Sequence, residues 1–371
     1  MRIALVTNTA WNIYNFRLGL VQALQQQGHQ VLLVAPPDGY SKRLRESGLT
    51  LHDVGMDSRG VNPVRDVLLT LELYQLYNKL SLDLIMHFTV KPNIYGTLAA
   101  SYLKIPVINN VCGLGTVFLQ DGMVSVVAKW LYRISFRFSQ KVFFHNPDDH
   151  ELFIREGLLA YKKADIVPGS GIDTLRFQPS LQHSSPQHTF TFLVISRLIY
   201  DKGILEYIEA AQRLKLQGIN VRCQLLGAKD PGHKRGIPVE LIDQWAGSGV
   251  VDYLGTTDDV RSLIQQADCV VLPSYREGLP RTLLEAASLQ KPIVTTNTAG
   301  CRHVVKHGVN GLLCKVGDAT DLAEKMSTMA QLAKEEIRLM GERGREMVQA
   351  EFSQKVVVDK YVQAIGEMIV N

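Results

Sequence analysis

Short apolar runs of about six residues alternate with helical stretches along most of the chain. In the first half, these runs are RIALVT (2–7), QVLLVA (30–35), LDLIMH (82–87), IPVINN (105–110) and KVFFHN (141–146). Strands that are buried on both faces of a parallel sheet have this continuous apolar character. The stretch RLGLVQALQQQG (17–28) separates two of the runs and closes on Gly28, as helices commonly do. The pattern predicts an α/β fold with a doubly wound sheet.

The same alternation restarts in the second half. The runs there are TFLVIS (191–196), VRCQLLG (221–227), CVVLPS (269–274) and PIVTTN (292–297). Between the two series, FQPSLQHSSPQH (177–188) is polar and contains proline, which is typical of an interdomain linker. We therefore expect one domain over 1–176, a second over 177–351 that includes the linker, and an amphipathic C-terminal helix over 352–371.

Composition and charge exclude several classes of protein. With 46% hydrophobic and 20% charged residues, the chain resembles an average globular protein. Residues 1–176 carry 18 Lys and Arg against 14 Asp and Glu, whereas the remaining residues carry 22 against 22. This excess is too small for a nucleic-acid-binding protein but suits a half that faces an anionic surface or substrate. Five scattered cysteines, and no apparent signal peptide or transmembrane run, predict a cytoplasmic protein.

Two loops that follow strands carry charged residues. SRLIYDKG (196–203) places Arg197 and Lys202 between a strand and a helix, at the edge where ligands bind in such sheets. The second loop, PSYREGLPRTLLEA (273–286), places Pro280 at an expected first helical position. The amides of Gly278 and Leu279 would then lie at a helix N-terminus, which favours an anion.

Glu277 and Glu285 flank this helix start. Glu285 lies five residues after Pro280, or about 7.5 Å along a helix axis. A bound diphosphate would leave Glu285 near the ribose of a nucleotide and Glu277 near an attached sugar, and carboxylates accept hydrogen bonds from hydroxyl pairs. The alternative is that both are ordinary solvated glutamates at a helix start.

Together these motifs resemble the retaining glycosyltransferases of family 4, which have the GT-B architecture. The resemblance rests on E-x7-E after PSxxEG, on SRLxxxKG, and on PGSGID (168–173) and GHQVLLVA (28–35). It implies two Rossmann-like domains facing across a cleft, with the acceptor in the first, a sugar-nucleotide donor in the second, and the C-terminal helix packed back on the first. It also implies that Arg197 and Lys202 neutralise the diphosphate leaving group, that Glu277 contacts the donor sugar and that Glu285 contacts the ribose. The other implied donor-binding residues are Ser196, Gly278, Leu279 and Pro280.

A narrower resemblance concerns the acceptor. The glycine-free loop NTAWNIYNFR (8–17), HFTVKPNIYG (87–96) and INNVCGLGTVF (108–118) are similar to bacterial O-antigen, capsule and N-glycan enzymes. Those enzymes add N-acetylhexosamine, for example GalNAc from a UDP-sugar, to a polyprenyl-diphosphate-linked saccharide. The candidate acceptor-binding residues are Asn15, Arg17, His87, Lys91, Gly113 and Gly115. Plainer alternatives are a structural histidine for His87, a turn for Gly113 and Gly115, and a solvated helix-start cation for Arg17.

Residues 121–141 bear independently on the prediction that the acceptor is a membrane lipid. In DGMVSVVAKWLYRISFRFSQK, the cations Lys129, Arg133, Arg137 and Lys141 recur every fourth residue. On one helix they would share a face, and basic aromatic helices of this kind lie on anionic membranes. We therefore expect peripheral docking on the inner face of a bacterial cell membrane. The alternative is a half-buried helix whose cations reach solvent along its edge.

No D-x-D occurs in the sequence, and the adjacent pairs Asp148–Asp149 and Asp258–Asp259 are typical helix caps. We therefore expect no metal and no cofactor, so that Arg197 and Lys202 supply the positive charge. The lack of a G-x-G-x-x-G after the first strand disfavours a nicotinamide dehydrogenase. A sugar-nucleotide epimerase and a non-catalytic sugar-nucleotide-binding protein of the same architecture remain open alternatives.

Overall fold

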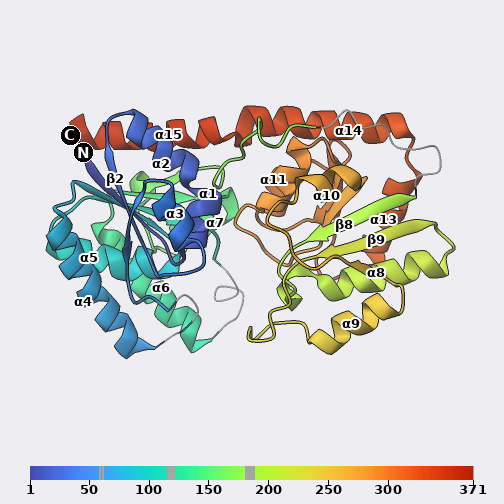
Figure 1. Cartoon of the computed structure of the whole chain (residues 1–371), viewed down its shortest axis with the longest axis horizontal. Coiled ribbons are helices and arrows are strands. Elements are labelled where there is room, and N and C mark those ends of the chain that lie inside the picture. The colour runs from blue at the N-terminus through green and yellow to red at the C-terminus, as the bar shows by residue number, and fades with distance from the viewer. Residues whose placement is uncertain (58–59, 61, 115–121, 180–188, 371) are drawn as a thin grey trace. The chain divides into compact units, whose positions relative to one another are not determined.

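The computed structural model describes residues 1–57, 60, 62–114, 122–179 and 189–370, and it divides into two compact units (Figure 1). Unit 1 comprises Met1–Gly171 with Gln354–Asn371, and unit 2 comprises Ile172–Ser353. The division falls before the boundary expected after residue 176. The Ile172 N–H donates to the carbonyl of Phe352, and Phe177 packs in the core of unit 2. Most of the expected linker, 180–188, lies outside the described residues.

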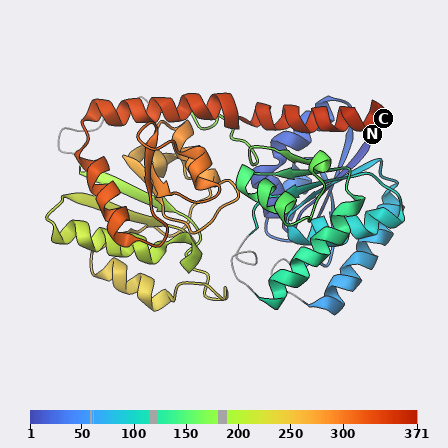
Figure 2. The same cartoon turned by 180° about the vertical axis from the view of Figure 1, so that it is seen from behind.

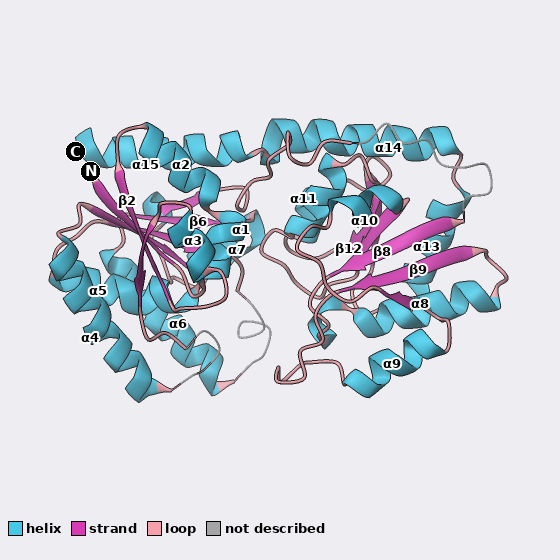
Figure 3. Cartoon of the chain, viewed as in Figure 1, coloured by secondary structure: helices cyan, strands magenta, loops and turns pink. Residues whose placement is uncertain are grey.

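Unit 1 is built on a parallel sheet with helices on both faces (Figure 3). Among the described residues, the strand order is β3-β2-β1-β4-β5-β6-β7. The strands are β1 Arg2–Val6, β2 Gln30–Ala35, β3 Thr50–Asp53, β4 Leu84–Phe88, β5 Val107–Val111, β6 Lys141–Phe144 and β7 Ala164–Ile166. The helices are α1 Ala10–Phe16, α2 Leu18–Gln26, α3 Ser41–Glu46, α4 Pro63–Leu80, the π-helical turn η1 Pro92–Gly96, α5 Thr97–Tyr102, α6 Met123–Ser135, the 3-10 turn η3 Phe136–Phe138, α7 Pro147–Arg155, the 3-10 turn η4 Tyr161–Lys163 and α15 Gln354–Val370.

Both faces of this sheet are covered, which explains the continuous apolar runs. In β1, Ile3 and Leu5 pack in a cluster that includes Tyr361 of α15, whereas Ala4 and Val6 pack in a cluster that includes Leu73 of α4. Since successive side chains of a strand point to opposite faces, both sets must be apolar. Helix α15 lies beside α2 in Figures 1 and 2, and it brings the C-terminal segment back to unit 1.

Unit 2 repeats the plan. Among the described residues, its parallel strand order is β10-β9-β8-β11-β12-β13. The strands are β8 Phe190–Ile195, β9 Val221–Leu226, β10 Asp252–Tyr253, β11 Cys269–Leu272, β12 Ile293–Thr296 and β13 Gly311–Cys314. The helices are the 3-10 turn η5 Tyr200–Lys202, α8 Ile204–Leu216, α9 Val239–Gly247, α10 Arg261–Gln266, α11 Arg281–Ser288, α12 Cys301–Val304, α13 Ala319–Gln331, α14 Lys334–Met347 and the π-helical turn η6 Val348–Phe352. The prediction of two doubly wound α/β domains is confirmed.

Two expected elements differ from the observed ones. The helix expected over 121–141 is wrong: α6 ends at Ser135, a 3-10 turn follows, and Ser139 is extended before β6 begins at Lys141. The four cations therefore do not share one helical face. The helix expected over 352–371 begins at Gln354, because Phe352 is 5% exposed and belongs to the core of unit 2.

Candidate active site

Two loops of unit 2 leave the sheet at the same edge. Strands β8 and β11 are parallel neighbours, with Cys269 opposite Phe192 and Val271 opposite Val194. The loop after β8 carries Arg197 and leads through η5 into α8, and the loop after β11 carries Glu277 and leads into α11. The two motifs seen in the sequence therefore start side by side at the carboxyl edge, where ligands bind in such sheets.

The structure brings two of the predicted residues into contact. The Lys202 ammonium forms an ion pair with the Glu277 carboxylate, and their side chains are only 18% and 13% exposed. Partial burial strengthens such a pair relative to one at the surface. Arg197 is exposed, and among the described residues its side chain has no ion pair. The neighbouring Ser196 hydroxyl donates to the Arg197 carbonyl at 3.1 Å.

Backbone contacts fix the loop that carries Glu277. The Tyr275 N–H and the Ser274 hydroxyl both donate to the Asp201 carbonyl, at 3.0 and 3.2 Å. The Glu277 N–H donates to the Ala299 carbonyl at 3.2 Å, which ties the loop to the segment after β12. Loops that follow three neighbouring strands are thus bonded to one another, so Glu277 is held in place from both sides.

Two glycines that the sequence reasoning missed allow this close packing. A Cβ on Gly203 would lie 2.0 Å from the Pro273 carbonyl oxygen, and one on Gly300 would lie 2.6 Å from the Glu277 carbonyl oxygen. Both residues have positive φ, +69° and +79°, which glycine adopts at little cost. Their signal in the sequence is a glycine directly before a helix that follows a strand, in YDKGIL and NTAGCR.

Helix α11 begins one residue later than expected. Pro280 has an extended backbone and occupies the N-cap position, so Arg281 is the first helical residue. Gly278 is buried and Leu279 is half-buried in the preceding turn. Pro280 was expected at the first helical position, and that expectation is corrected; the turn still leads directly into the helix N-terminus.

Glu285 lies one turn inside α11 and has a partner of its own. The Arg281 Nε donates to its Oε1 at 2.9 Å, and the glutamate side chain is 13% exposed. Burial raises the pKa of Glu285, and the nearby Arg281 charge opposes that shift. Each predicted glutamate is therefore paired with a cation from its own sheet edge. The i, i+4 spacing of Arg281 and Glu285 was a visible signal for one of these pairs.

The acceptor candidates of unit 1 differ in accessibility. Arg17 is 2% exposed, and His87 is fully buried. The His87 ring bonds with the Tyr77 hydroxyl at 3.0 Å and with the Asn109 side chain at 3.1 Å, and burial lowers its pKa to about 3. This geometry favours the structural alternative for His87. The Lys91 ammonium lies 2.7 Å from the Asp66 carboxylate, so its charge is already compensated.

The remaining candidates are less informative. The Asn15 amide donates to the Trp11 carbonyl at 3.0 Å within α1. Gly113 follows β5 with φ +130°, and Gly115 lies outside the described residues. Asn15 thus bonds within its own helix and Gly113 lies in a turn, and neither contact indicates how an acceptor would bind.

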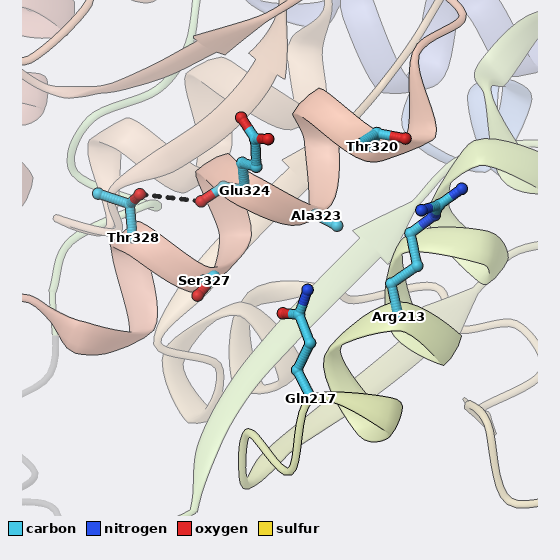
Figure 4. Close-up of a pocket in the computed structure, with 7 residues that line it drawn as sticks. All are labelled: Arg213, Gln217, Thr320, Ala323, Glu324, Ser327 and Thr328. Atoms are coloured by element: carbon cyan, nitrogen blue, oxygen red, sulfur yellow. Dashed lines mark hydrogen bonds between the residues drawn. The ribbon is translucent and has the colours of Figure 1, made fainter.

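A separate hollow of about 460 Å³ lies between α8 and α13 (Figure 4). Its lining is Arg213, Gln217, Thr320, Ala323, Glu324, Ser327 and Thr328. The Thr328 hydroxyl donates to the Glu324 carbonyl at 2.9 Å within α13. None of these side chains is a predicted site residue, and we assign no ligand to this hollow.

Two further properties concern the described part of the chain. It contains no group of three or more His, Cys, Asp or Glu side chains placed to hold a metal ion. Nor does any helix in it have both the length and the apolar character needed to cross a membrane.

Two units that each contain a parallel α/β sheet, with cations at a carboxyl edge, are the features of a GT-B glycosyltransferase, and a solved structure matches the fold. Anabaena HepE in complex with UDP superposes with a TM-score of 0.79, covering 99% of this chain and 100% of HepE, at 20% identity. At that identity, the match concerns the fold alone.

Sequence comparisons give the family. Residues 180–347 match "Glycosyl transferases group 1" and residues 2–146 match "Glycosyl transferase 4-like". The chain is 30% identical, over the full length of both, to the N,N'-diacetylbacillosaminyl-diphospho-undecaprenol alpha-1,3-N-acetylgalactosaminyltransferase of Campylobacter jejuni. It is 23% identical to the UDP-Gal:alpha-D-GlcNAc-diphosphoundecaprenol alpha-1,3-galactosyltransferase of Escherichia coli, covering 84% of this chain and 82% of that one. The chain belongs to the family 4 glycosyltransferases.

Proposed function

We propose that this glycosyltransferase transfers an N-acetylhexosamine, such as GalNAc, from a UDP-sugar to a polyprenyl-diphosphate-linked saccharide, with retention of the anomeric configuration. The product would enter a bacterial surface polysaccharide such as O-antigen or capsule, or a related glycan. The observation that carries the donor half is the largely buried Lys202–Glu277 pair at the sheet edge that also carries the exposed Arg197. The acceptor half is supported by two relatives whose names contain diphospho-undecaprenol or diphosphoundecaprenol sugars.

In this proposal, the cations stabilise the leaving group. Arg197 and Lys202 lie after β8, and the turn at Gly278 leads into α11, so a diphosphate there would meet two positive charges and a helix N-terminus. As the glycosidic bond stretches, negative charge develops on the diphosphate and the sugar becomes oxocarbenium-like. The acceptor hydroxyl then enters from the same face and passes its proton towards the departing phosphate.

Because side-chain cations can stabilise the negative charge that develops on the diphosphate, we propose that the reaction is metal-independent. The cations that would replace a metal come from the sequence motif SRLIYDKG, and the sequence has no D-x-D. Glu277 contacts the donor sugar and, by leaving Lys202, frees an ammonium for the diphosphate. We assign Glu277 no nucleophilic role, unlike the second carboxylate of retaining hydrolases.

The lipid acceptor requires a place at a membrane, and unit 1 has an apolar surface that suits it. Helix α6 exposes Met123, Val126 and Trp130 by 84, 66 and 60%. Helix α4 exposes Val64 and Val67 by 69 and 61%, and the two helices lie side by side in Figures 1 and 2. Several large exposed apolar side chains on neighbouring helices are typical of interaction surfaces.

The cations of this region have protein partners. The Lys129 ammonium lies 3.0 Å from the Glu156 carboxylate, and Arg133 donates to the carbonyls of Glu156 and Gly157. We therefore propose that apolar insertion of α4 and α6 supplies most of the docking free energy on the inner face of the cell membrane. Attraction of the basic half of the chain to anionic lipid would add to it.

The proposal is tested by product mass. The protein would be incubated with UDP- and GDP-sugars and with short-chain polyprenyl-diphosphate saccharides. We expect one UDP-N-acetylhexosamine to add one sugar to the acceptor, with an α linkage by NMR if the donor is α. Conversion of the donor alone into another sugar nucleotide would establish the epimerase alternative. UDP-sugar binding without UDP release in the presence of any acceptor would establish the non-catalytic one.

A variant tests the role of Arg197. Arg197→Ala should lower kcat by about 100-fold or more, because a positioned charge that acts in the transition state is lost. Arg213→Ala is a matched control, since Arg213 lies on α8 in the separate hollow and pairs with Glu209. Near-normal turnover of Arg197→Ala would remove the main support of the mechanism.

A further inference from the structure

Unit 1 contains a buried guanidinium group without an acidic partner. Arg17 lies at the junction of α1 and α2 and is 2% exposed. Its Cζ lies 4.2 Å from the centre of the Phe88 ring, and one Nη lies 3.4 Å from the Cys112 sulfur. Its Nε is buried without a hydrogen-bond partner, and among the described residues Arg17 forms no ion pair. Buried charges are normally paired, and a cation–π contact compensates only part of the desolvation cost.

The groups around Arg17 are uncharged. Burial raises the pKa of the Cys112 thiol, and the pKa of the Tyr361 phenol is shifted upward in the same way. Burial, together with the charge of Arg17, lowers the pKa of His145 to about 3, so that this imidazole is neutral at pH 7. The positive charge of Arg17 is therefore not offset by any of these neighbours.

Thr89, whose backbone bonds with the Cys112 thiol, and His145, on whose ring the Arg17 charge acts, form a cluster with Arg17, and each carries a polar group without a partner. The Thr89 hydroxyl and the His145 Nε2 are both buried without a hydrogen bond. Thr89 also has φ +75°, which is rare and strained for a β-branched residue. Such strain and unsatisfied polar groups are retained at functional sites more often than elsewhere.

The position of the cluster is that of a ligand site. Thr89 follows β4, Cys112 follows β5 and His145 follows β6, while Arg17 ends the first helix after β1. Thr89, Cys112 and His145 therefore lie at the carboxyl edge of the sheet of unit 1, and Arg17 lies there too because its Nη contacts the Cys112 sulfur. Lys91 lies near the same edge, but Asp66 neutralises it.

We propose that Arg17, with the Thr89 hydroxyl and the His145 ring, forms an oxyanion site in unit 1 that binds a phosphate of a diphosphate group. The guanidinium presents its donors in a planar fork that matches phosphate geometry, and the hydroxyl and a ring N–H add two neutral donors. Binding an anion there compensates the buried charge and satisfies the donors. This inference rests on the proposed function for the carrier of the anion, which is the diphosphate of the polyprenyl acceptor.

The test separates this site from the donor site. Inorganic pyrophosphate and geranyl diphosphate would be titrated calorimetrically into a full-length chain carrying Arg197→Gln and Lys202→Gln, which weakens the site in unit 2. Adding Arg17→Gln should weaken binding of both ligands by about tenfold or more, because charge-assisted hydrogen bonds are lost. Arg2→Gln is the matched control: its Nε is also buried without a partner, but it lies at the amino end of β1.

Equal affinities in the presence and absence of Arg17→Gln would overturn the site. Arg17-dependent binding of pyrophosphate with no binding of geranyl diphosphate would overturn the acceptor assignment. Neither result depends on sugar transfer, so failure of the proposed function is recorded separately by product mass.

A second measurement applies if Arg17→Gln does not fold. Cys112 is partly exposed, whereas the other four cysteines are buried, so alkylation reports on this position. In the wild-type chain, pyrophosphate should slow alkylation of Cys112 about threefold or more, because an anion on Arg17 covers the adjacent sulfur. Binding measured by calorimetry with no change in the alkylation rate would place the anion elsewhere.

Discussion

Glu277 and Glu285 each have a cationic partner at the candidate site. Glu277 pairs with Lys202, and Glu285 pairs with Arg281. A carboxylate that is largely buried needs such a partner, since an unpaired buried charge is costly. In the proposed function, the diphosphate of a UDP-sugar pairs with Lys202, and the Glu277 carboxylate becomes available to hydroxyl groups of the sugar. Ligand binding then moves Lys202 from one anion to another, and hydroxyl donors compensate the Glu277 carboxylate.

Substituting the two glutamates should therefore change different quantities: the Kd for UDP in one variant and kcat in the other. Glu285→Gln should raise the Kd for UDP by about tenfold, because the ribose loses a charge-assisted hydrogen bond. Glu277→Gln should leave the Kd for UDP unchanged or lower it, since UDP has no donor sugar and Lys202 is freed, while kcat falls. Calorimetry with UDP and steady-state kinetics measure the two effects. The reverse assignment of effects would show that the nucleotide binds in the opposite direction.

Buried histidines make stability depend on pH. Burial lowers the pKa values of His87 and His145 to about 3, so both stay neutral in the folded chain while the unfolded chain binds protons below a pKa near 6.5. The free energy of unfolding should thus fall as pH drops from about 6.5, by roughly 1.4 kcal/mol per pH unit for each histidine. Urea unfolding between pH 7.5 and 5 measures this slope. His87→Gln should reduce the slope, and an unchanged slope in His87→Gln contradicts the assignment.

For single residues, the sequence predicted which side chains lie at the site better than it predicted the contacts that they make. Arg197, Lys202 and the two glutamates could be placed at one edge because the strands before them are recognisable. Neither the Lys202–Glu277 pair, 75 residues apart, nor the burial of Arg17 leaves a local signal. Those contacts depend on side-chain packing after the sheet has formed.

Among the elements, the turn between β12 and α12 depends on a glycine. Gly300 has φ +79°, and a Cβ there would lie 2.6 Å from the Glu277 carbonyl oxygen. Gly308 has a similar φ of +74°, but a Cβ at that position would have nothing within 4 Å. Gly300→Ala should therefore destabilise the chain by about 2 kcal/mol more than Gly308→Ala, and weaken UDP binding as well. Urea unfolding and UDP titration compare the two variants; equal stabilities would show that Gly300 is not a close-packing position.

Helix α6 offers a test of membrane docking. Trp130→Glu should reduce sedimentation with phosphatidylglycerol-containing liposomes by about tenfold, because a large apolar side chain is replaced by a charge. Leu216→Glu is the control, since Leu216 of unit 2 is also exposed, at 88%. Binding driven by apolar insertion should persist in high salt, where surface charges are screened. Complete loss of binding in high salt, with no effect of Trp130→Glu, would show instead that attraction between basic residues and anionic lipid drives docking.

The predicted elements were most reliable where both faces of the sheet are covered. The interior strands β1, β2, β4, β8 and β11 appear as continuous apolar runs, since each side of each strand is buried. The strands β3, β7, β10 and β13 were not predicted, because each is only two to four residues long; the first three are also partly exposed. The helix expected over 121–141 was too long, since a four-residue repeat of cations continues through the turn and into β6 without being helical.

For the whole molecule, the sequence predicts two α/β units but not the residue at which the first unit ends. The alternation of runs gives two sheets, and the comparisons agree on the fold and the family. The division at Gly171 depends on Ile172 bonding to Phe352, a contact between segments far apart in the chain. The return of α15 to unit 1 likewise depends on packing of Tyr361 among residues of β1 and α2.

The most direct test of the central claim is a crystal structure of the full chain with a non-hydrolysable UDP-N-acetylhexosamine. We expect the diphosphate beside Lys202 and Arg197 at the turn before α11, the ribose hydroxyls on the Glu285 carboxylate, and the sugar near Glu277. A nucleotide bound elsewhere, with Glu277 still paired to Lys202 and Glu285 to Arg281, would contradict the account.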